Sequence, residues 1–586
     1  MSFMRFCTLL LISFFCMPYI SHSIPVEETN KKFDSYKERF VTAMWEVYPA
    51  WASSVGYHLY DDKLVISDAA AREKEIRFCT EHADSLSQFD LSQLNDANKT
   101  DYHLMRYQLK YTKWGIKVLR TYEWDPSGYN VSGMFAEMLA NDYAPINERL
   151  KNLNKKLAAV PAYYAAAKEN LKNPTKEHTD LAIQQNKGGL GVLGDDLEQA
   201  LVKSTLPVTE QNEIRKRAKS AVAAIEDYIK WLGKLEHKTP RSFRLGKELY
   251  AQKFELELQS GYDAASIYQK ALLRKDELHD KMYESTRLLW SKYFGEAMPA
   301  DKLQAIKKMI DKLSENHVSA DSFQIAIEQQ IPELTEFIKK KNLLYIDPSK
   351  PLVVRKEPAY MAGVAGASIS SPGPYDKNGN TYYNVGSLEG WEKDKAESYL
   401  QEYNKYILQI LNIHEAIPGH YTQLVYANQS PSIIKAILGN NAMIEGWAVY
   451  TELMMLENGY DVDPKVRGVA ASAEMWLMYY KWNLRSTCNT ILDYSVHADN
   501  MSKEEAMNLL VKEAFQQQAE AEGKWKRVTL TQVQLCCYFT GFTEICNLRQ
   551  EMMVKQGTAF DLKKFHEQFL SYGSAPVKYI KELMMK

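Results

Sequence analysis

The sequence predicts a mainly α-helical protein that carries one small β insert. Apolar residues recur at three- and four-residue steps through most of the chain, as they do at Leu150, Leu153, Leu157 and Val160. This spacing places such residues on one face of a helix. The spacing breaks off once, near residues 350–386, and resumes after that segment. We therefore expect a large helical body with a single excursion into extended structure.

The composition is that of a globular protein with a large core. The chain has 586 residues, of which 45% are hydrophobic and 25% are charged. The formal net charge is only −2, so there is no electrostatic footprint for nucleic acid or for an anionic membrane surface. The substrate expected from this balance is small or peptidic. We expect an N-terminal helical part over residues 24–345 and a second helical part, with the β insert, over residues 346–586, joined in one continuous body.

The first 23 residues have the pattern of an export signal. Arg5 provides the positive charge, residues 6–20 form the apolar stretch, and Ser21-His22-Ser23 offers the small residues of a cleavage site. The apolar stretch is shorter than the roughly twenty residues of a membrane span, and an uncleaved anchor is the alternative. We expect an exported protein, periplasmic or extracellular, with no stable membrane span once the signal is removed.

The β insert contains a candidate substrate contact. Residues 352–355 and 381–385 are β-prone runs, and the segment between them is rich in Gly, Ala, Ser and Pro. An extended edge over residues 381–385 could pair with the backbone of a bound peptide as an added strand. Tyr383 and Asn384 are the candidate substrate-binding residues there. A plain surface hairpin is the alternative.

His414, Glu415 and His420 form the candidate centre of the chemistry. A catalytic zinc needs three protein ligands, an open position for water, and a nearby carboxylate that takes a proton from that water. A His-Glu pair followed by a second His on the same helix is a common solution, and the second His normally comes four residues after the first. Here it comes six residues after the first. In a regular helix the two rings would then lie roughly 120° apart.

Pro418 and Gly419 offer a way around this mismatch. Pro418 cannot donate the hydrogen bond that would reach the carbonyl of His414, and Gly419 tolerates almost any backbone angle. A widened turn that absorbs two residues would bring His420 back beside His414. The alternative is a packed, hydrogen-bonded histidine pair on a kinked helix.

Glu445 is the candidate third ligand. It follows His420 by a gap that fits one loop and a returning helix. Its apolar neighbours Met443 and Trp447 make a metal or a cation the expected partner of its carboxylate. The alternative is a solvent-facing acid at the start of a helix. Gly446 would let two helix backbones approach closely.

These motifs resemble those of a known family. His-Glu-Ala-Ile-Pro-Gly-His over residues 414–420 and Glu-Gly-Trp-Ala-Val-Tyr over residues 445–450 are similar to the two motifs of the domain of unknown function 885 family, whose members are regarded as metallopeptidases of the gluzincin type. The resemblance covers most of the chain after the signal. It implies a helical fold with a deep channel and one zinc ion between the motif helices. Tyr421 stands where members often have another histidine, which leaves His420 as the second ligand.

Further site residues follow from the resemblance and from helical spacing. The resemblance places Asp493 and His497 in the active site, where His497 could stabilise the developing oxyanion and Asp493 could fix its tautomer. Gln534 and Tyr538 share one face of an apolar helix; Gln534 would contact substrate, and Tyr538 is the candidate second oxyanion donor. Arg549, further along this helix, would bind a substrate carboxylate or a structural acid, and we favour the structural acid.

These residues together predict a zinc-dependent hydrolase. His414, His420 and Glu445 would hold one Zn²⁺ per chain, and Glu415 would accept a proton from the attacking water. A peptidase that cleaves small peptides is the first expectation. One alternative is hydrolysis of a non-peptide amide or ester at the same metal, and another is a non-catalytic exported binding protein. Manganese or cobalt would fit the same ligands.

Overall fold

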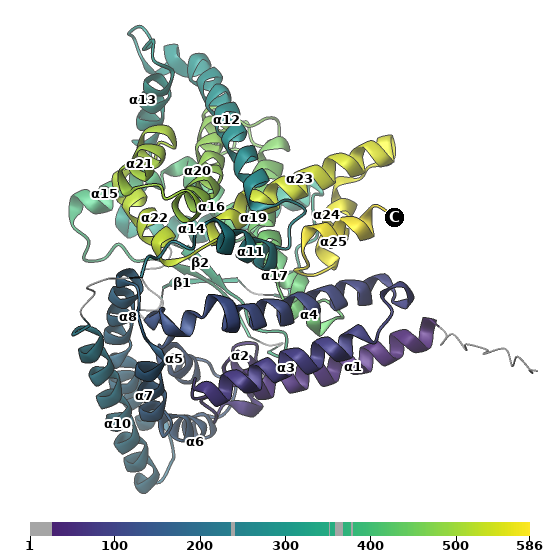
Figure 1. Cartoon of the computed structure of the whole chain (residues 1–586). Coiled ribbons are helices and arrows are strands. Elements are labelled where there is room, and N and C mark those ends of the chain that lie inside the picture. The colour runs from purple at the N-terminus through teal and green to yellow at the C-terminus, as the bar shows by residue number, and fades with distance from the viewer. Residues whose placement is uncertain (1–25, 236–240, 351, 358–366, 377–378) are drawn as a thin grey trace, which may run out of the picture.

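The structure is a computed structural model that describes residues 26–235, 241–350, 352–357, 367–376 and 379–586. The predicted export signal, residues 1–23, lies outside this part of the chain. Within the described residues, twenty-five α-helices accompany one three-stranded sheet (Figure 1). The predicted fold class, mainly α with a small β insert, is therefore confirmed.

The first part of the chain forms two groups of helices in the lower half of Figure 1. One group consists of α1 (Val26–Val47), α2 (Pro49–Ser54), α3 (Ala69–Ser87) and α4 (Asp96–Trp114), and the other of α5 (Ser132–Ala140), α6 (Ile146–Leu157), α7 (Val160–Asn170), α8 (Lys176–Gly188), α9 (Leu197–Lys203) and α10 (Val208–Leu232). Helix α3 packs on both α1 and α4. Capping residues fix where these helices begin; for example, the Asp68 carboxylate accepts from the backbone N–H of Ala71.

The second part fills the upper half of Figure 1 and contains the sheet. Before the sheet come α11 (Lys247–Leu258), α12 (Ala264–Tyr293), α13 (Lys302–Ser314) and α14 (Phe323–Lys341). After it come α15 (Lys393–Glu402), α16 (Lys405–Glu415), α17 (His420–Asn428), α18 (Ile433–Ile437), α19 (Asn441–Glu457), α20 (Ala473–Ala498), α21 (Lys503–Met507), α22 (Gln518–Leu530), α23 (Cys537–Gln556), α24 (Leu562–Ser571) and α25 (Val577–Met584). Helix α16 packs against α14, α19 and α20, and α19 packs along α23.

Two hydrophobic cores hold the helices together. The smaller core lies among α5 to α10 and includes the predicted helix face of Leu150, Leu153 and Leu157. The larger core joins the first helices of the chain to those of its second half; Trp45 of α1 and Trp447 of α19 both belong to it and are fully buried. It thus extends across the boundary expected at residue 345, and residues of both expected parts share one interior.

The small sheet has the strand order β1-β3-β2, with β1 (Leu352–Lys356), β2 (Ala367–Ser370) and β3 (Thr381–Val385). Strand β1 runs parallel to β3, and β2 runs antiparallel to it, with Ile369 opposite Tyr383. The prediction of a free edge over residues 381–385 was wrong, because β3 is the middle strand and has a partner on each side. Among the described strands, the edges belong to β1 and β2.

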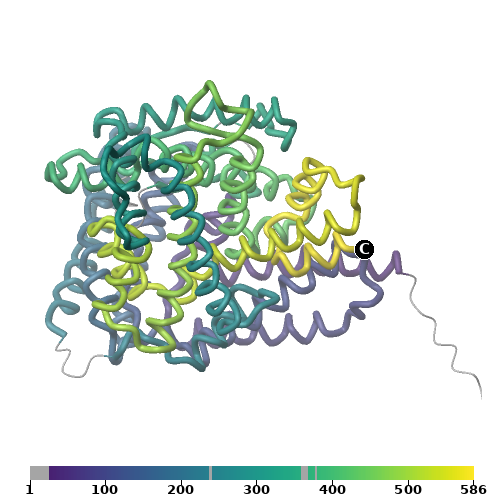
Figure 2. Tube along the Cα trace, turned by 90° about the horizontal axis from the view of Figure 1, so that it is seen from above, coloured from purple at the N-terminus to yellow at the C-terminus, as the bar shows by residue number. Residues whose placement is uncertain are grey.

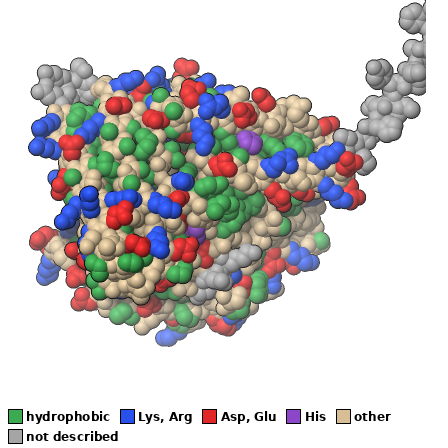
Figure 3. Space-filling view, turned by 90° about the horizontal axis from the view of Figure 1, so that it is seen from below, with side chains coloured by type: hydrophobic (Ala, Val, Ile, Leu, Met, Phe, Trp, Pro, Cys, Tyr) green, Lys and Arg blue, Asp and Glu red, His purple; other side chains and the backbone are tan. Residues whose placement is uncertain are grey.

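The surface agrees with the small net charge. Lys, Arg, Asp and Glu side chains are interspersed over the face shown in Figure 3. The described residues contain no helix whose length and hydropathy would together allow it to cross a membrane. Helix α1 and the C-terminal helices lie on the same side of the molecule (Figure 2), and Lys586 forms an ion pair with Asp96 of α4.

Candidate metal centre

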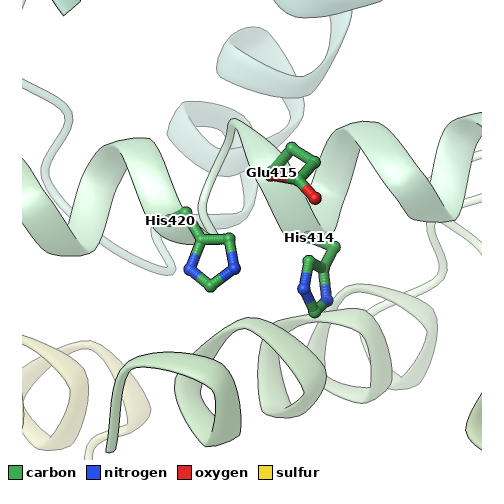
Figure 4. Close-up of side chains that lie close together, drawn as sticks. All are labelled: His414, Glu415 and His420. Atoms are coloured by element: carbon green, nitrogen blue, oxygen red, sulfur yellow. The ribbon is translucent and has the colours of Figure 1, made fainter. Parts of the chain in front are cut away.

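The chain between His414 and His420 is an interruption between two helices. Helix α16 ends at Glu415 and α17 begins at His420. A cis peptide bond joins Ile417 to Pro418, and the Gly419 N–H donates to the carbonyl of Ile413 (2.9 Å). In place of the expected widened turn, one helix therefore ends and a second helix begins. Its effect is the expected one: the two imidazole centroids lie 4.8 Å apart, and the rings project to the same side of the chain (Figure 4).

Packing explains why glycine and proline stand in this interruption. A Cβ atom on Gly419 would lie only 1.8 Å from the carbonyl oxygen of His414, so a larger residue would push the chain away from the end of α16. The Trp447 indole N–H of α19 donates to the carbonyl of Pro418 (2.9 Å). The loop is thus fixed from inside by a residue of the second motif.

Glu445 of α19 completes a three-donor cluster. The Asn440 side chain caps α19 by accepting from the Met443 N–H, and one turn later Glu445 Oε2 lies 3.7 Å from His414 Nε2 and 3.3 Å from His420 Nε2. Ligand atoms of a tetrahedral zinc with bonds of about 2.0–2.1 Å lie roughly 3.3–3.4 Å apart. Oε2 is buried and makes no hydrogen bond of acceptable geometry within the described part of the chain. The donor types suit a metal ion, and the distances from Glu445 to the two imidazoles are close to this spacing.

Glu452, which the sequence analysis missed, orients His414. Its Oε1 lies 2.7 Å from His414 Nδ1 and also accepts from the Trp482 indole N–H (3.0 Å). Since Nδ1 faces a carboxylate, it carries the proton, and the lone pair of Nε2 is left for the cluster. The available signal was a second acid seven residues after Glu445 on the same face of an apolar helix.

The electrostatics of the cluster favour a bound cation. Burial alone would lower the pKa of His414, but the carboxylates of Glu445 and Glu452 beside its ring nitrogens raise it to about 10. Burial alone would raise the pKa of Glu445, but His420 and His414 hold it well below its usual range. Surroundings that retain a proton this strongly would equally stabilise a metal ion in its place.

Glu415 lies beside the cluster, but its carboxylate is farther from the two imidazoles than the carboxylate of Glu445. One carboxylate oxygen of Glu415 and ring nitrogens of His414 and His420 lie within 4.8 Å of one another, whereas Glu445 Oε2 is nearer to each ring. These shorter distances favour Glu445 over Glu415 as the candidate third donor. Burial, together with the charge of Glu445, raises the pKa of Glu415.

Tyr538 lies over one of the candidate ligands. Its ring stacks on that of His414, with centroids 6.3 Å apart and planes inclined by 21°. The Arg527 side chain, which was not predicted, donates from Nη2 to the Tyr538 hydroxyl (3.1 Å) and to Gln534 Oε1 (2.8 Å). Tyr538 therefore lies next to the cluster, and Gln534 and Arg527 are connected to Tyr538 through these hydrogen bonds.

Asp493 and His497 are placed differently from the expectation. The Asp493 carboxylate accepts from the backbone N–H groups of Val533 and Leu535 (2.9 and 3.0 Å). His497 Nε2 lies 2.8 Å from the carbonyl of Val528, so that nitrogen is protonated and already bonded. Both side chains are fully buried. The expected contact of His497 with an oxyanion does not fit these bonds; the pair instead braces the segment that leads into Tyr538.

Three other candidates also make internal contacts. The Tyr383 hydroxyl donates to Asn412 Oδ1 (2.9 Å), which ties β3 to α16. Asn384 accepts from Arg355 Nε and donates to a serine of β2, so it is used within the sheet. Both are fully buried; the substrate-binding role expected for them does not fit this burial. Arg549 forms an ion pair with Glu457 (2.7 Å), which is the structural role favoured above.

Comparisons with known proteins agree with this architecture. A family described as "Bacterial protein of unknown function (DUF885)" matches residues 49–584. A solved structure from Shewanella oneidensis, described as "a putative lipoprotein of unknown function", is 49% identical over 94% of this chain and 100% of that chain, with a TM-score of 0.84.

A second solved structure, described as a "putative lipoprotein" from Colwellia psychrerythraea, is 16% identical over 95% of this chain and 98% of that chain, with a TM-score of 0.76. At that identity it shows the fold alone. No match was found among curated proteins. Since the family match spans nearly the whole chain beyond the predicted signal, this protein belongs to the DUF885 family of bacterial proteins of unknown function.

Proposed function

We propose that this protein is an exported, zinc-dependent hydrolase that cleaves peptide bonds in small peptides. One observation carries the proposal: a buried oxygen of Glu445, without a hydrogen bond among the described residues, lies 3.7 Å from Nε2 of His414 and 3.3 Å from Nε2 of His420. A bound cation would stabilise a carboxylate and two imidazoles held this close together in a buried site.

His414, His420 and Glu445 would hold the zinc ion. When bound, zinc would supply a Lewis acid and lower the pKa of a water molecule in the open fourth position towards 7. Glu452 supports this ligand set from behind, because it keeps His414 in the tautomer whose Nε2 lone pair is free. The side chains of Glu445 and His420 are 18% and 12% exposed, so solvent reaches part of each.

The neighbouring side chains suit hydrolysis. Glu415 would take a proton from the attacking water and pass it to the leaving amine, and its burial-raised pKa makes it a better base for the first transfer. The Tyr538 hydroxyl accepts a hydrogen bond from Arg527, so its own proton is available to the oxyanion that develops on the substrate. His497 has no part in this step, because its Nε2 is bonded to backbone carbonyls.

Strand β2 supports a peptide as substrate. It packs against α16, the helix that carries His414, and in the described part of the sheet its backbone is paired only on the β3 side. A peptide in extended conformation could add to this edge and lie across the cluster. We therefore expect a peptide substrate to pair with β2 (Ala367–Ser370) and not with residues 381–385.

Hydrolysis assays test this proposal directly. Zinc-loaded protein is incubated with short peptides, non-peptide amides and esters, beside Glu415→Gln and a matched control, Glu457→Gln, whose carboxylate pairs with Arg549. We expect peptide cleavage by the wild type and the control, and a loss of at least about 100-fold in kcat for Glu415→Gln with zinc still bound. Cleavage of amides or esters alone, or unchanged activity of Glu415→Gln, would overturn it.

Export is the second part of the proposal. It is supported by the sequence pattern of residues 1–23 and by the description of the Shewanella oneidensis relative as a "putative lipoprotein". We place the protein in the periplasm or outside the cell. N-terminal sequencing of protein recovered from those fractions should begin near Ile24; recovery of the uncut chain from the cytoplasm would contradict export.

A further inference from the structure

Helix α22 presents a row of charged residues toward the candidate metal centre. Glu520, Lys524 and Arg527 are spaced by four and three residues and so share one face of the helix. Arg527 lies closest to the centre: its Nη2 donates to the Tyr538 hydroxyl, and the Tyr538 ring stacks on that of His414. A single aromatic ring thus separates its guanidinium from a candidate ligand.

A second arginine approaches the centre from α20. The guanidinium of Arg485 lies 4.7 Å from the ring centroid of Trp482, and the Trp482 indole donates to Glu452, the partner of His414. Arg485 Nε and Nη2 also donate to Glu520 Oε1 (3.1 and 2.6 Å). Each arginine is therefore linked to His414 by a chain of contacts. Arg527 is linked through Tyr538, and Arg485 through Trp482 and Glu452.

The basic side chains of this group outnumber the carboxylates that pair with them. Glu520 serves Arg485 through hydrogen bonds and Lys524 only through a 3.9 Å ion pair. The Lys524 side chain is 3% exposed, yet its ammonium makes no hydrogen bond within the described residues, and burial and Arg485 lower its pKa. The nearby Glu402 is already paired with Lys481 (2.6 Å).

Arg527 also has donors to spare. Its Nη2 makes both of the hydrogen bonds to Gln534 and Tyr538, while Nε and Nη1 make none to the part of the chain that the structure describes. Glu520 is thus the carboxylate that Arg485 and Lys524 share, and Arg527 forms no ion pair with a carboxylate of the described residues.

We propose that Arg527 and Lys524, with Arg485 behind them, bind a carboxylate of the peptide substrate and direct cleavage to a bond close to that carboxylate. The inference rests on the proposed function and names its substrate class. The Nε–H and Nη1–H groups of Arg527 are free to donate charge-assisted hydrogen bonds to a carboxylate, and the under-partnered Lys524 side chain beside them adds a further contact. The carboxylate is that of the peptide's C-terminus or of an acidic side chain.

A binding measurement tests the inference without turnover. Zinc-loaded Glu415→Gln protein is titrated calorimetrically with N-acetyl-trialanine as the free acid, with its C-terminal amide, and with an amide whose last residue is glutamate. We expect the free acid to bind at least about 10-fold more tightly than the amide, as charge-assisted hydrogen bonds allow. The glutamate amide distinguishes the source: weak binding assigns the site to a terminal carboxylate, and binding equal to that of the acid assigns it to any carboxylate.

Variants locate the site. Arg527→Gln and Lys524→Met should each weaken binding of the acid about 10-fold and leave binding of the amide within about twofold. Lys524→Met keeps the buried apolar stem and removes an ammonium that lacks a hydrogen bond in the described structure, so it should fold even if Arg527→Gln does not. The matched control is Arg467→Gln, whose guanidinium pairs with Glu333 (2.9 Å) and stacks on Tyr460 away from the centre; it should change neither affinity.

Two outcomes overturn the inference. Either the acid and the amide bind equally well, or the two variants weaken both ligands to the same extent. Failure of the proposed function looks different: if the wild type cleaves no peptide, but the acid still binds more tightly than the amide and Lys524→Met removes that preference, then the carboxylate site stands and the hydrolase proposal falls.

Discussion

Gly446 of α19 faces Gly541 of α23 so closely that a Cβ atom added to Gly446 would lie 2.3 Å from the carbonyl carbon of Gly541. The two helices therefore pack backbone against backbone. The sequence predicted that Gly446 permits a close approach, although the partner is α23 and not the helix of the first motif. Since Glu445 precedes Gly446 and Tyr538 precedes Gly541 by three residues, this contact sets the distance between a candidate ligand and a candidate oxyanion donor.

Gly446→Ala should therefore damage both stability and metal binding. The new methyl group would force the backbones apart, and overpacking of this kind typically lowers the free energy of unfolding by about 1–3 kcal/mol. The control is Gly523→Ala in α22, where an added Cβ meets nothing within 4 Å; it should raise stability by roughly 0.5–1 kcal/mol. Thermal unfolding of both variants checks this, and a Gly446→Ala protein as stable as the wild type would refute the packing argument.

Glu452→Gln should weaken zinc binding without removing it. The variant keeps an acceptor near His414 Nδ1 but loses the charge that makes the imidazole a better donor, and the loss of such a partner typically lowers metal affinity about 10- to 100-fold. Competition with a chelator measures the effect. Glu457→Gln, on the same helix but paired with Arg549, should retain wild-type affinity. Equal affinities for the two variants would exclude the orienting role of Glu452.

Tyr538→Phe should lower turnover and leave zinc in place. The change removes the phenol proton while keeping the ring that stacks on His414, and loss of one oxyanion donor typically lowers kcat about 100- to 1,000-fold. Steady-state kinetics on a cleaved peptide would show this as a change in kcat with KM little altered. Tyr345→Phe, an exposed tyrosine, is the control. A KM effect alone would assign Tyr538 to substrate binding.

Asp493→Asn should loosen the segment before Tyr538. Asp493 holds the N–H groups of Val533 and Leu535 on either side of Gln534, and Val533 has a positive φ of 71°, which is strained for a β-branched residue. An asparagine can accept with only one oxygen, so one buried N–H would lose its partner at a cost of about 1–3 kcal/mol. Thermal unfolding should show that loss, and hydrogen exchange should rise at residues 533–535. Unchanged exchange there would contradict the bracing role.

The sequence contained enough to predict the helical fold, the β insert and the meeting of His414 with His420. These depend on local features: helical spacing, β-prone runs, and a proline-glycine step that cannot continue a helix. Glu445 could be inferred because a carboxylate among apolar residues needs a partner. Such features are visible without tertiary structure.

The remaining parts depend on contacts between distant segments. Strand β2 (Ala367–Ser370) is short, and Ile369 is its single strongly β-prone residue, so its pairing with β3 and the central place of β3 were not foreseeable. The partners of His497 are carbonyls more than thirty residues away, which no helical spacing indicates. Arg527 reaches the centre only because α22 packs beside it, and nothing in its own sequence neighbourhood marks it out.

The zinc content of purified protein tests the central claim most directly. Elemental analysis should compare the wild type with His420→Ala, Glu445→Gln and a control, His317→Ala, whose ring pairs with Glu397 outside the cluster. We predict about one zinc per chain in the wild type and the control, and no more than roughly a tenth of that in the other two variants. Replacement of one of the three zinc ligands should remove most of the affinity for zinc. Full zinc occupancy in His420→Ala and Glu445→Gln, or none in the wild type after incubation with zinc, would contradict the account.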